Sequence, residues 1–190
     1  MKFSKTIFPE VFLIKPDIHK DNRGSFLIQF KNQVFKDETG ININFCQDNL
    51  AYSKKGVLRG LHYQLHPYSQ SKLVSVIKGK VLDVLVDIRY GSPTYGQHLS
   101  VELSEDNRLQ LFIPRGFAHG YITLSENSIF HYKVDSYYQP EKECNISPSD
   151  LDLKIDWKLP KEKWIQSDKD SNQSNFKDAI LFDYNIDLYE

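Results

Sequence analysis

Short apolar stretches rich in β-branched residues, separated by polar turns, fill the middle of this 190-residue chain. Residues 72–88 read KLVSVIKGKVLDVLVDI, which is two such stretches on either side of Gly79. This pattern predicts a β-hairpin, because glycine accepts the positive φ that a tight turn requires. The strand–turn–strand pattern recurs at 100–113 and at 120–134. Short strands at this spacing predict a sandwich or a closed barrel, which hides its strand edges.

Helical patterns are scarce. One short candidate covers 33–38 and ends before Gly40, and a second covers 174–180. The charged, asparagine-rich stretch 158–178 predicts an excursion over the surface. We therefore expect an all-β fold with a few short helices.

The length suits one domain. We expect that domain to span residues 1–190, with a barrel core at about 42–138 and a C-terminal extension at about 139–190. Neither an internal repeat nor a low-complexity linker interrupts the chain.

The charge balance excludes several classes of function. The 24 Lys and Arg residues are matched by 25 Asp and Glu residues, so a global field that attracts nucleic acid is not expected. The apolar runs are too short to cross a bilayer, and residues 1–12 lack the apolar stretch of a signal peptide. Cys46 and Cys144 have neither metal nor redox spacing, which favours a reduced, cytoplasmic location. We expect no nucleic-acid partner and no membrane partner.

Three polar clusters exceed what a purely structural β-barrel needs. They are Arg-Gly-Leu-His-Tyr-Gln at 59–64, Pro-Arg-Gly-Phe-Ala-His-Gly at 114–120, and the tyrosine- and lysine-bearing stretch 132–138. A lone histidine is more often a satisfied or exposed side chain than a functional one. Because the three clusters occur together, we interpret them as the lining of a functional site.

Alternate residues of a β-strand share a face. We therefore expect Gly60, His62 and Gln64 to point one way, and Arg59, Leu61 and Tyr63 to point the other. If the first set faces a barrel interior, His62 lines a cavity.

The two segments that carry glycine and histidine are similar to the paired motifs of cupin barrels. Metal-binding cupins present His-x-His, then a Glu, then a distant His, whereas Gln64 stands here in the second histidine position. No Glu occurs between Gln64 and Glu102, and His62 with His119 alone would bind a first-row metal poorly. We expect no metal in this site.

A metal-free cavity with histidine, lysine, tyrosine and arginine suits proton transfer. Neutral histidine has a reference pKa of about 6.5 and acts as a base near neutrality, with a carboxylate usually fixing its tautomer. Lysine stabilises an enolate, tyrosine returns a proton, and arginine binds a diphosphate. The sequence offers many carboxylates and by itself selects none of them.

The ordered series of motifs resembles the dTDP-4-dehydrorhamnose 3,5-epimerases and their nucleotide-sugar relatives from Phe8 through Asp170. The most specific string is Arg-Gly-Leu-His-Tyr-Gln. The matching stretches are DNRGSF at 21–26, QDN at 47–49, GVLRGLHYQ at 56–64, QSKLV at 70–74, VDIR at 86–89, SPTYG at 92–96, the turn 114–120, and the tyrosines at 132, 137 and 138.

The resemblance implies a homodimeric cupin or jelly-roll barrel that binds a nucleotide-diphospho-sugar and needs neither metal nor organic cofactor. It implies that His62 is the catalytic base and that Asp170 is the carboxylate paired with it. Tyr132 matches the acid on the opposite sugar face, and Lys72 matches the group near the enolate oxygen.

The resemblance also implies a set of substrate-binding residues. Arg59, His119, Gln47, Asn49 and Tyr138 match positions that line the substrate. Two more, Arg23 and Phe26, match a strand segment that reaches the nucleotide in the neighbouring subunit. The chain departs from the family at Ser25, at 146–150, at His66-Pro67 and at His131.

The expected activity is epimerisation at C3 and C5 of dTDP-4-dehydro-6-deoxy-D-glucose, giving dTDP-4-dehydro-L-rhamnose. Alternatives within the class are a C3-only epimerase and an enzyme for a GDP- or CDP-linked 4-keto sugar or heptose. Alternatives from other classes are a metal-dependent cupin and a non-catalytic sugar-binding cupin.

Overall fold

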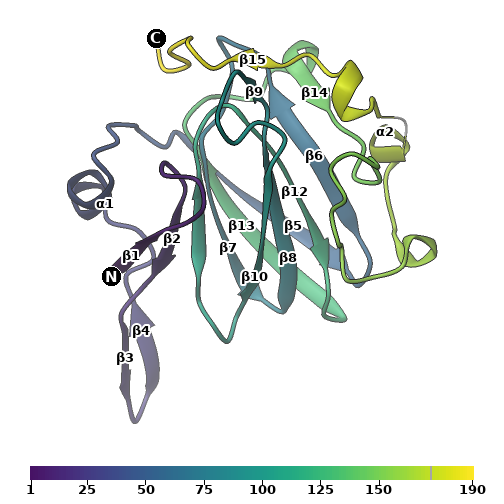
Figure 1. Cartoon of the computed structure of the whole chain (residues 1–190). Helices are drawn as coiled ribbons and strands as arrows, with labels where there is room; N and C mark the ends of the chain where they lie inside the picture. The colour runs from purple at the N-terminus through teal and green to yellow at the C-terminus, as the bar shows by residue number, and fades with distance from the viewer. Residues whose placement is uncertain (172) are drawn as a thin grey trace.

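The structure is a computed structural model that describes residues 1–171 and 173–190. Two antiparallel sheets face each other and enclose a common core (Figure 1). The six-stranded sheet has the order β1 (Lys2–Lys5), β2 (Phe12–Lys15), β11 (Gln110–Ile113), β7 (Lys72–Lys78), β13 (Asn127–Val134), β5 (Gln47–Lys54). The five-stranded sheet has the order β10 (His98–Ser104), β8 (Lys80–Asp87), β12 (Phe117–Thr123), β6 (Leu58–Gln64), β14 (Glu143–Asn145). The expected all-β barrel of the jelly-roll type is confirmed.

Smaller elements surround this barrel. Two short sheets pair β3 (Ile18–Asp21) with β4 (Gly24–Leu27), and β9 (Arg89–Tyr90) with β15 (Phe182–Asp183). The helical elements are α1 (Asn32–Thr39), α2 (Asp168–Ser171), and the 3₁₀ turns Pro140–Lys142, Lys161–Lys163 and Phe176–Asp178. Among the described residues, no helix has the length and apolar character that crossing a membrane requires.

The predicted hairpin at 72–88 is wrong in its pairing, although both of its strands form. Strands β7 and β8 flank Gly79 as expected, yet they lie in different sheets. The same holds for β10 with β11 and for β12 with β13. A tight turn with a positive φ, here 79° at Gly79, serves a sheet crossing as well as a hairpin. The local sequence pattern therefore identifies the turn, but it does not identify the strand with which each flanking strand pairs.

Strand β8 is buried on both faces, which explains its nearly continuous apolar sequence. Val81 and Leu85 pack into the core between the sheets, whereas Val84 and Val86 pack outward. The outer cluster is completed by the C-terminal extension, through Trp157, Phe176, Phe182 and Leu188. The extension thus covers the outer face of the five-stranded sheet, to the right of the barrel and across its top in Figure 1.

The predicted helix at 33–38 is confirmed as α1, which ends at Gly40 with φ 74° and buries Phe35. The predicted helix at 174–180 is wrong, because only the short 3₁₀ turn Phe176–Asp178 forms there. The backbone of this turn is held by a hydrogen bond to a different part of the C-terminal extension. The amide of Phe176 donates to Asp150 Oδ2 at 2.7 Å.

Strand β6 carries a bulge beside β12. His119 pairs with His62 and Tyr121 pairs with Arg59, so β6 has one more residue than β12 over this stretch. Gly60 has φ 115°, and a Cβ there would lie 2.5 Å from a backbone atom of β12. Both the dihedral angle and the close approach of the strands therefore require glycine.

We predict that Gly60→Ala destabilises the protein by about 2–5 kcal/mol. The positive φ costs about 1–2 kcal/mol and the contact with β12 costs about 1–3 kcal/mol. Gly40→Ala is the matched control, because Gly40 has φ 74° and no atom within 4 Å of an added Cβ. Urea denaturation measures both free energies of unfolding. An equal loss of unfolding free energy in the two variants would show that the close approach of β6 to β12 at Gly60 contributes nothing.

Candidate active site

A cavity of about 220 Å³ lies between the two sheets. Six predicted site residues line it: Arg59, His62, Lys72, His119, Tyr132 and Tyr138. The lining also includes Gln70, Tyr121 and Glu143, to which the sequence analysis gave no role. Because side chains from both sheets meet here, a bound molecule would be contacted from two opposite walls.

The bulge in β6 corrects the predicted orientation of Arg59. Simple alternation places Arg59 and His62 on opposite faces, yet both line the cavity. The extra residue in β6 interrupts the alternation between Arg59 and His62. These two side chains are three positions apart and therefore point to the same face. Leu61 packs in the outer cluster, as the alternation requires. The bulge therefore brings a guanidinium and an imidazole to one wall.

His62 and Asp170, 108 residues apart, are brought together. Nε2 of His62 lies 2.5 Å from Oδ1 of Asp170, which comes from α2 and is 7% exposed. Oδ2 accepts a hydrogen bond from Ser167 Oγ at 2.7 Å, and Gln173 Nε2 donates to Oδ1 at 3.2 Å. The carboxylate is fixed through both oxygens, so it orients the imidazole. With Nε2 donating, Nδ1 carries the lone pair.

Asp170 remains ionised at neutral pH. Burial alone would raise the pKa of its carboxyl, but the hydrogen bonds from His62 and Ser167 outweigh burial and lower it below the ordinary value. A carboxylate with a lowered folded-state pKa contributes stability above its unfolded pKa. That contribution is lost as the pH falls through the folded value. The His62–Asp170 pair is therefore intact across the physiological range.

A second pair joins His119 to Asp83, with Nε2 2.9 Å from Oδ2. Burial lowers the pKa of His119, against the opposing influence of Asp83. His119 is therefore a neutral cavity residue near pH 7. Asp83 belongs to none of the predicted polar clusters, although a carboxylate inside the apolar run KVLDVLVD is itself a signal. Such a charge is costly to bury unless it is paired.

Lys72 begins β7 and is half-buried at the cavity. Burial lowers its pKa to about 8, while the carboxylates of Asp83 and Glu143 oppose the shift. In the described parts of the chain, no hydrogen-bond partner occupies its ammonium. Lys72 therefore offers a free positive charge at neutral pH.

Tyr132 reaches the cavity from β13, in the sheet opposite β6. Its phenol therefore approaches from the wall opposite His62. Burial raises the pKa of Tyr132, so the hydroxyl keeps its proton near neutrality. An imidazole on one wall thus faces a protonated phenol on the other.

Tyr138, Glu143 and Lys169 form a polar cluster at the cavity. The Tyr138 hydroxyl and the Lys169 ammonium both donate to Glu143 Oε2. These hydrogen bonds overcome the effect of burial and lower the pKa of Glu143. Glu143 lies outside the predicted motifs and enters the site because β14 pairs with β6.

Gln47 and Asn49 lie beside the cavity rather than in its lining. They share a face of β5 with Ala51, which does line it, and Asn49 stands opposite Tyr132 in register. The Gln47 amide donates to Asn49 Oδ1 at 2.8 Å. The two residues extend the polar surface outward from the cavity.

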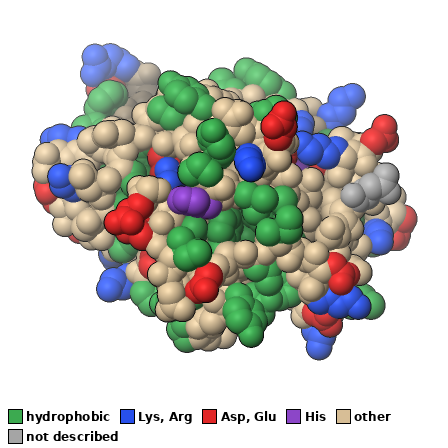
Figure 2. Space-filling model, turned by 90° about the horizontal axis from the view of Figure 1, so that it is seen from above, with side chains coloured by type: hydrophobic (Ala, Val, Ile, Leu, Met, Phe, Trp, Pro, Cys, Tyr) green, Lys and Arg blue, Asp and Glu red, His purple; other side chains and the backbone are tan. Residues whose placement is uncertain are grey.

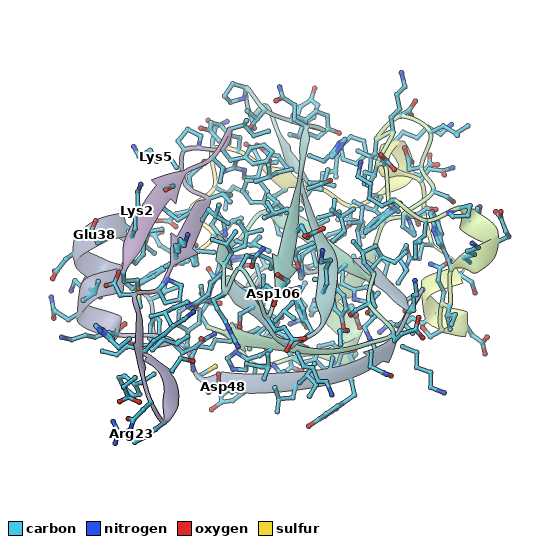
Figure 3. The ribbon with its side chains drawn as sticks, turned by 90° about the horizontal axis from the view of Figure 1, so that it is seen from below. Lys2, Lys5, Arg23, Glu38, Asp48 and Asp106 are labelled. Carbon is cyan, nitrogen blue, oxygen red and sulfur yellow. The ribbon has the colours of Figure 1, made fainter. Side chains whose placement is uncertain are left out.

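Arg23 and Phe26 are not brought to the cavity of their own chain. They lie on the β3–β4 arm, which projects from the body, with Arg23 at its far end (Figure 3). Arg23 Nη2 pairs with Asp21 Oδ2 at 2.6 Å, and Phe26 is 66% exposed. Neither residue is among those that line the cavity of this chain.

Within residues 1–171 and 173–190, no three His, Cys, Asp or Glu side chains gather as a metal site. The first two candidate ligands, His62 and His119, each direct Nε2 to a carboxylate. Gln64 accepts from the amide of Gln139 at 2.7 Å. Each of these three side chains has a hydrogen-bond partner within the protein. A metal-free reaction stays a prediction.

Comparison with known proteins places this site in a family. The family model described as dTDP-4-dehydrorhamnose 3,5-epimerase matches residues 5–178. A protein of that name from Shigella flexneri is 46% identical over 96% of this chain and 99% of its own length. The Legionella pneumophila 3,5-epimerase in complex with dTDP-4-keto-L-rhamnose is 43% identical, with a TM-score of 0.93 and coverage of 97% and 99%.

A Streptomyces bikiniensis 3'-monoepimerase in complex with dTDP-quinovose is also similar, at 30% identity and a TM-score of 0.83, with 89% and 85% of the two chains covered. The fold and the site define the class of nucleotide-sugar epimerases built on a cupin barrel. Within that class, the chain belongs to the dTDP-4-dehydrorhamnose 3,5-epimerase family.

We predict that Lys72 becomes reactive toward an amine-acylating reagent with a midpoint near pH 8. The cause is its burial, which disfavours the ammonium form. Peptide mapping by mass spectrometry after short labelling pulses measures the midpoint. In the urea-unfolded chain the midpoint should return to the ordinary lysine value of 10.5. The same high midpoint in folded and unfolded protein would contradict the assignment.

Proposed function

We propose that the protein epimerises dTDP-4-dehydro-6-deoxy-D-glucose at C3 and C5, giving dTDP-4-dehydro-L-rhamnose without metal or organic cofactor. The observation that carries the proposal is the pair His62–Asp170 on one wall of the cavity and protonated Tyr132 on the other. The whole chain, 1–190, acts as a single cytoplasmic epimerase domain in dTDP-rhamnose biosynthesis, which supplies polysaccharide or lipopolysaccharide assembly.

Nδ1 of His62 removes the proton from the carbon next to the C4 ketone. The electron pair of the broken C–H bond moves to the ketone oxygen and forms an enolate. Asp170 stabilises the imidazolium that results, because its carboxylate already accepts from Nε2. The Lys72 ammonium stabilises the negative oxygen.

Tyr132 then donates its phenolic proton to the same carbon from the opposite face, which inverts the centre. The enolate collapses to the ketone. The His62 imidazolium then releases its proton to solvent and the Tyr132 phenolate takes one up from solvent, which restores both groups for the next cycle. Because C3 and C5 both neighbour C4, one base and one acid serve both centres if the sugar presents each carbon in turn. Arg59, His119, Gln47, Asn49 and Tyr138 bind the substrate around this centre.

We propose epimerisation at both C3 and C5 rather than at C3 alone. Relatives named 3,5-epimerases reach 46% identity, whereas the 3'-monoepimerase reaches 30%. The dTDP-linked substrate is supported by the Legionella complex, against the GDP- and CDP-linked alternatives. A purely binding cupin has no need for a base and an acid on facing walls.

The active form is a homodimer in which Arg23 and Phe26 of one chain reach the nucleotide held by the other. Supporting this, the β3–β4 arm is exposed and stands away from its own cavity. Strand β5 is a sheet edge, and its outward Leu50 and Tyr52 are 55% and 68% exposed. An open edge with apolar side chains favours pairing with a second copy.

His62→Ala should abolish both epimerisation and exchange of substrate protons with D₂O, because the base is lost. Tyr132→Phe should retain part of the exchange while inversion fails, because only the acid is removed. Each change should lower turnover by about 10²–10⁴-fold. Proton NMR of the dTDP-4-keto sugar in D₂O reads deuterium at C3 and C5 separately. Equal loss of exchange in the two folded variants would overturn the assignment of base and acid.

Subunit mixing tests the shared site. Arg23→Ala and His62→Ala should each be nearly inactive alone, yet unfolding and refolding them together should restore roughly a quarter of the wild-type sites. One site of each mixed dimer then combines an intact His62 with an intact Arg23 from its partner. No recovery, with mixed dimers verified by mass spectrometry, would place both residues in one chain's site.

A further inference from the structure

The C-terminal segment 180–190, called the strap below, crosses one end of the barrel (Figure 1). It lies beyond residue 178, where the match to the family model ends. Viewed onto this end, hydrophobic side chains gather in the middle of the face and charged side chains surround them (Figure 2). The proposed reaction assigns no part to the strap.

The strap is held by backbone pairing and by apolar burial. Its strand β15 runs parallel to β9. Phe182 and Leu188 are 7% and 6% exposed, and the Tyr63 hydroxyl donates to the Ile180 carbonyl at 2.7 Å. These contacts fix the strap along its length, so it is a built part of the fold.

The far end of the strap contacts the segment that leads into β7. Ser69 Oγ lies 3.5 Å from the Leu188 carbonyl, and Ser71 Oγ lies 2.9 Å from the Tyr189 hydroxyl. Both serines are almost completely buried. The strap therefore fills the outer side of this segment and keeps water away from it.

The inner side of the same segment belongs to the cavity. Gln70 and Lys72 alternate with the two serines and line the cavity. The side-chain amide of Gln70 also donates to the Ser136 carbonyl at 2.7 Å. Because successive residues of an extended chain point to opposite sides, fixing the serines fixes the direction of the cavity side chains.

A buried ion pair strengthens this connection. Asp135 accepts from the Ser71 amide at 2.6 Å through Oδ1 and from Arg115 Nε at 3.2 Å through Oδ2. The Arg115 guanidinium also donates to the Leu188 carbonyl at 2.6 Å and lies 4.9 Å from the centre of the Tyr189 ring. Arg115 thus ties the strap to the residue that directly precedes Lys72.

We propose that the strap positions Lys72 for catalysis by holding the outer side of segment 69–72. The inference rests on the role proposed above for Lys72 at the enolate oxygen. A lysine side chain has about 2 kcal/mol of rotamer entropy, so its ammonium stays in place only if its base is fixed. Leu188 and Tyr189 are positioning residues, because they act through Ser69, Ser71 and Arg115 rather than on the substrate.

Shortening the strap tests the proposal. Ending the chain after Asp187 should lower kcat by about 10–100-fold, as a misplacement near 1 Å does, with KM nearly unchanged. Tyr189→Phe removes only the hydroxyl that meets Ser71, and should lower kcat by about 2–10-fold. Tyr184→Phe is the matched control in the same strap and should leave kcat unchanged. Unchanged kcat in both folded strap variants would overturn the proposal.

A double-mutant cycle separates positioning from general stability. If the strap acts through Lys72, shortening it in a Lys72→Met background should lower kcat no further, because the two losses share one cause. A purely structural strap would reduce kcat by the same factor in both backgrounds, and that result would overturn the proposal. Tyr189→Phe replaces the truncation in the cycle if the shortened chain fails to fold.

Labelling of Lys72 gives a readout that does not need turnover. Shortening the strap should raise its labelling midpoint from about 8 toward 10.5, because a released segment 69–72 lets the side chain leave its buried position near Asp83, Glu143 and His119 and reach solvent. The Tyr184→Phe control should keep the wild-type midpoint. A wild-type protein without turnover would refute the proposed function alone, whereas an unmoved midpoint in the shortened, folded chain would refute the strap's role.

Discussion

The outer face of the five-stranded sheet is apolar, and the active site depends on how that face is covered. Leu58, Leu61 and Val84 point outward and are fully buried under the C-terminal extension. Burial of such side chains contributes about 1.5–3 kcal/mol each. The same extension carries Asp170 to His62. The hydrophobic packing that completes the fold therefore also sets the position of the carboxylate that meets His62.

Three carboxylates approach the cavity, and each has a cationic or imidazole partner. Asp170 meets His62, Asp83 meets His119, and Glu143 meets Lys169. Lys72 lacks such a partner among the described residues, and burial lowers its pKa to about 8. The Lys72 ammonium is thus still charged near neutral pH, although burial leaves it with little contact with water. An anion that forms beside it in this low-dielectric space is stabilised more than it would be in water.

The sequence predicted the strands well because β-branched runs and polar turns are local signals. It did not predict their partners, since the turn at Gly79 suits a crossing between sheets as well as a hairpin. Arg59 was placed on the wrong face because a bulge adds one residue that periodicity does not reveal. Asp170 needed the family resemblance, since no local pattern links it to a histidine 108 residues away. Glu143 was missed for the same reason.

The size of the cavity bears on how a nucleotide sugar is divided between two chains. A drug-sized ligand usually occupies about 300–1,000 Å³, and this cavity of about 220 Å³ suits the sugar ring alone. In the proposed complex the nucleotide lies over the open rim, beside Gln47 and Asn49. The exposed β3–β4 arm of a second chain offers an aromatic ring and a guanidinium, the groups that a base and a diphosphate require. In the proposed dimer, chemistry belongs to one chain and nucleotide enclosure to its partner.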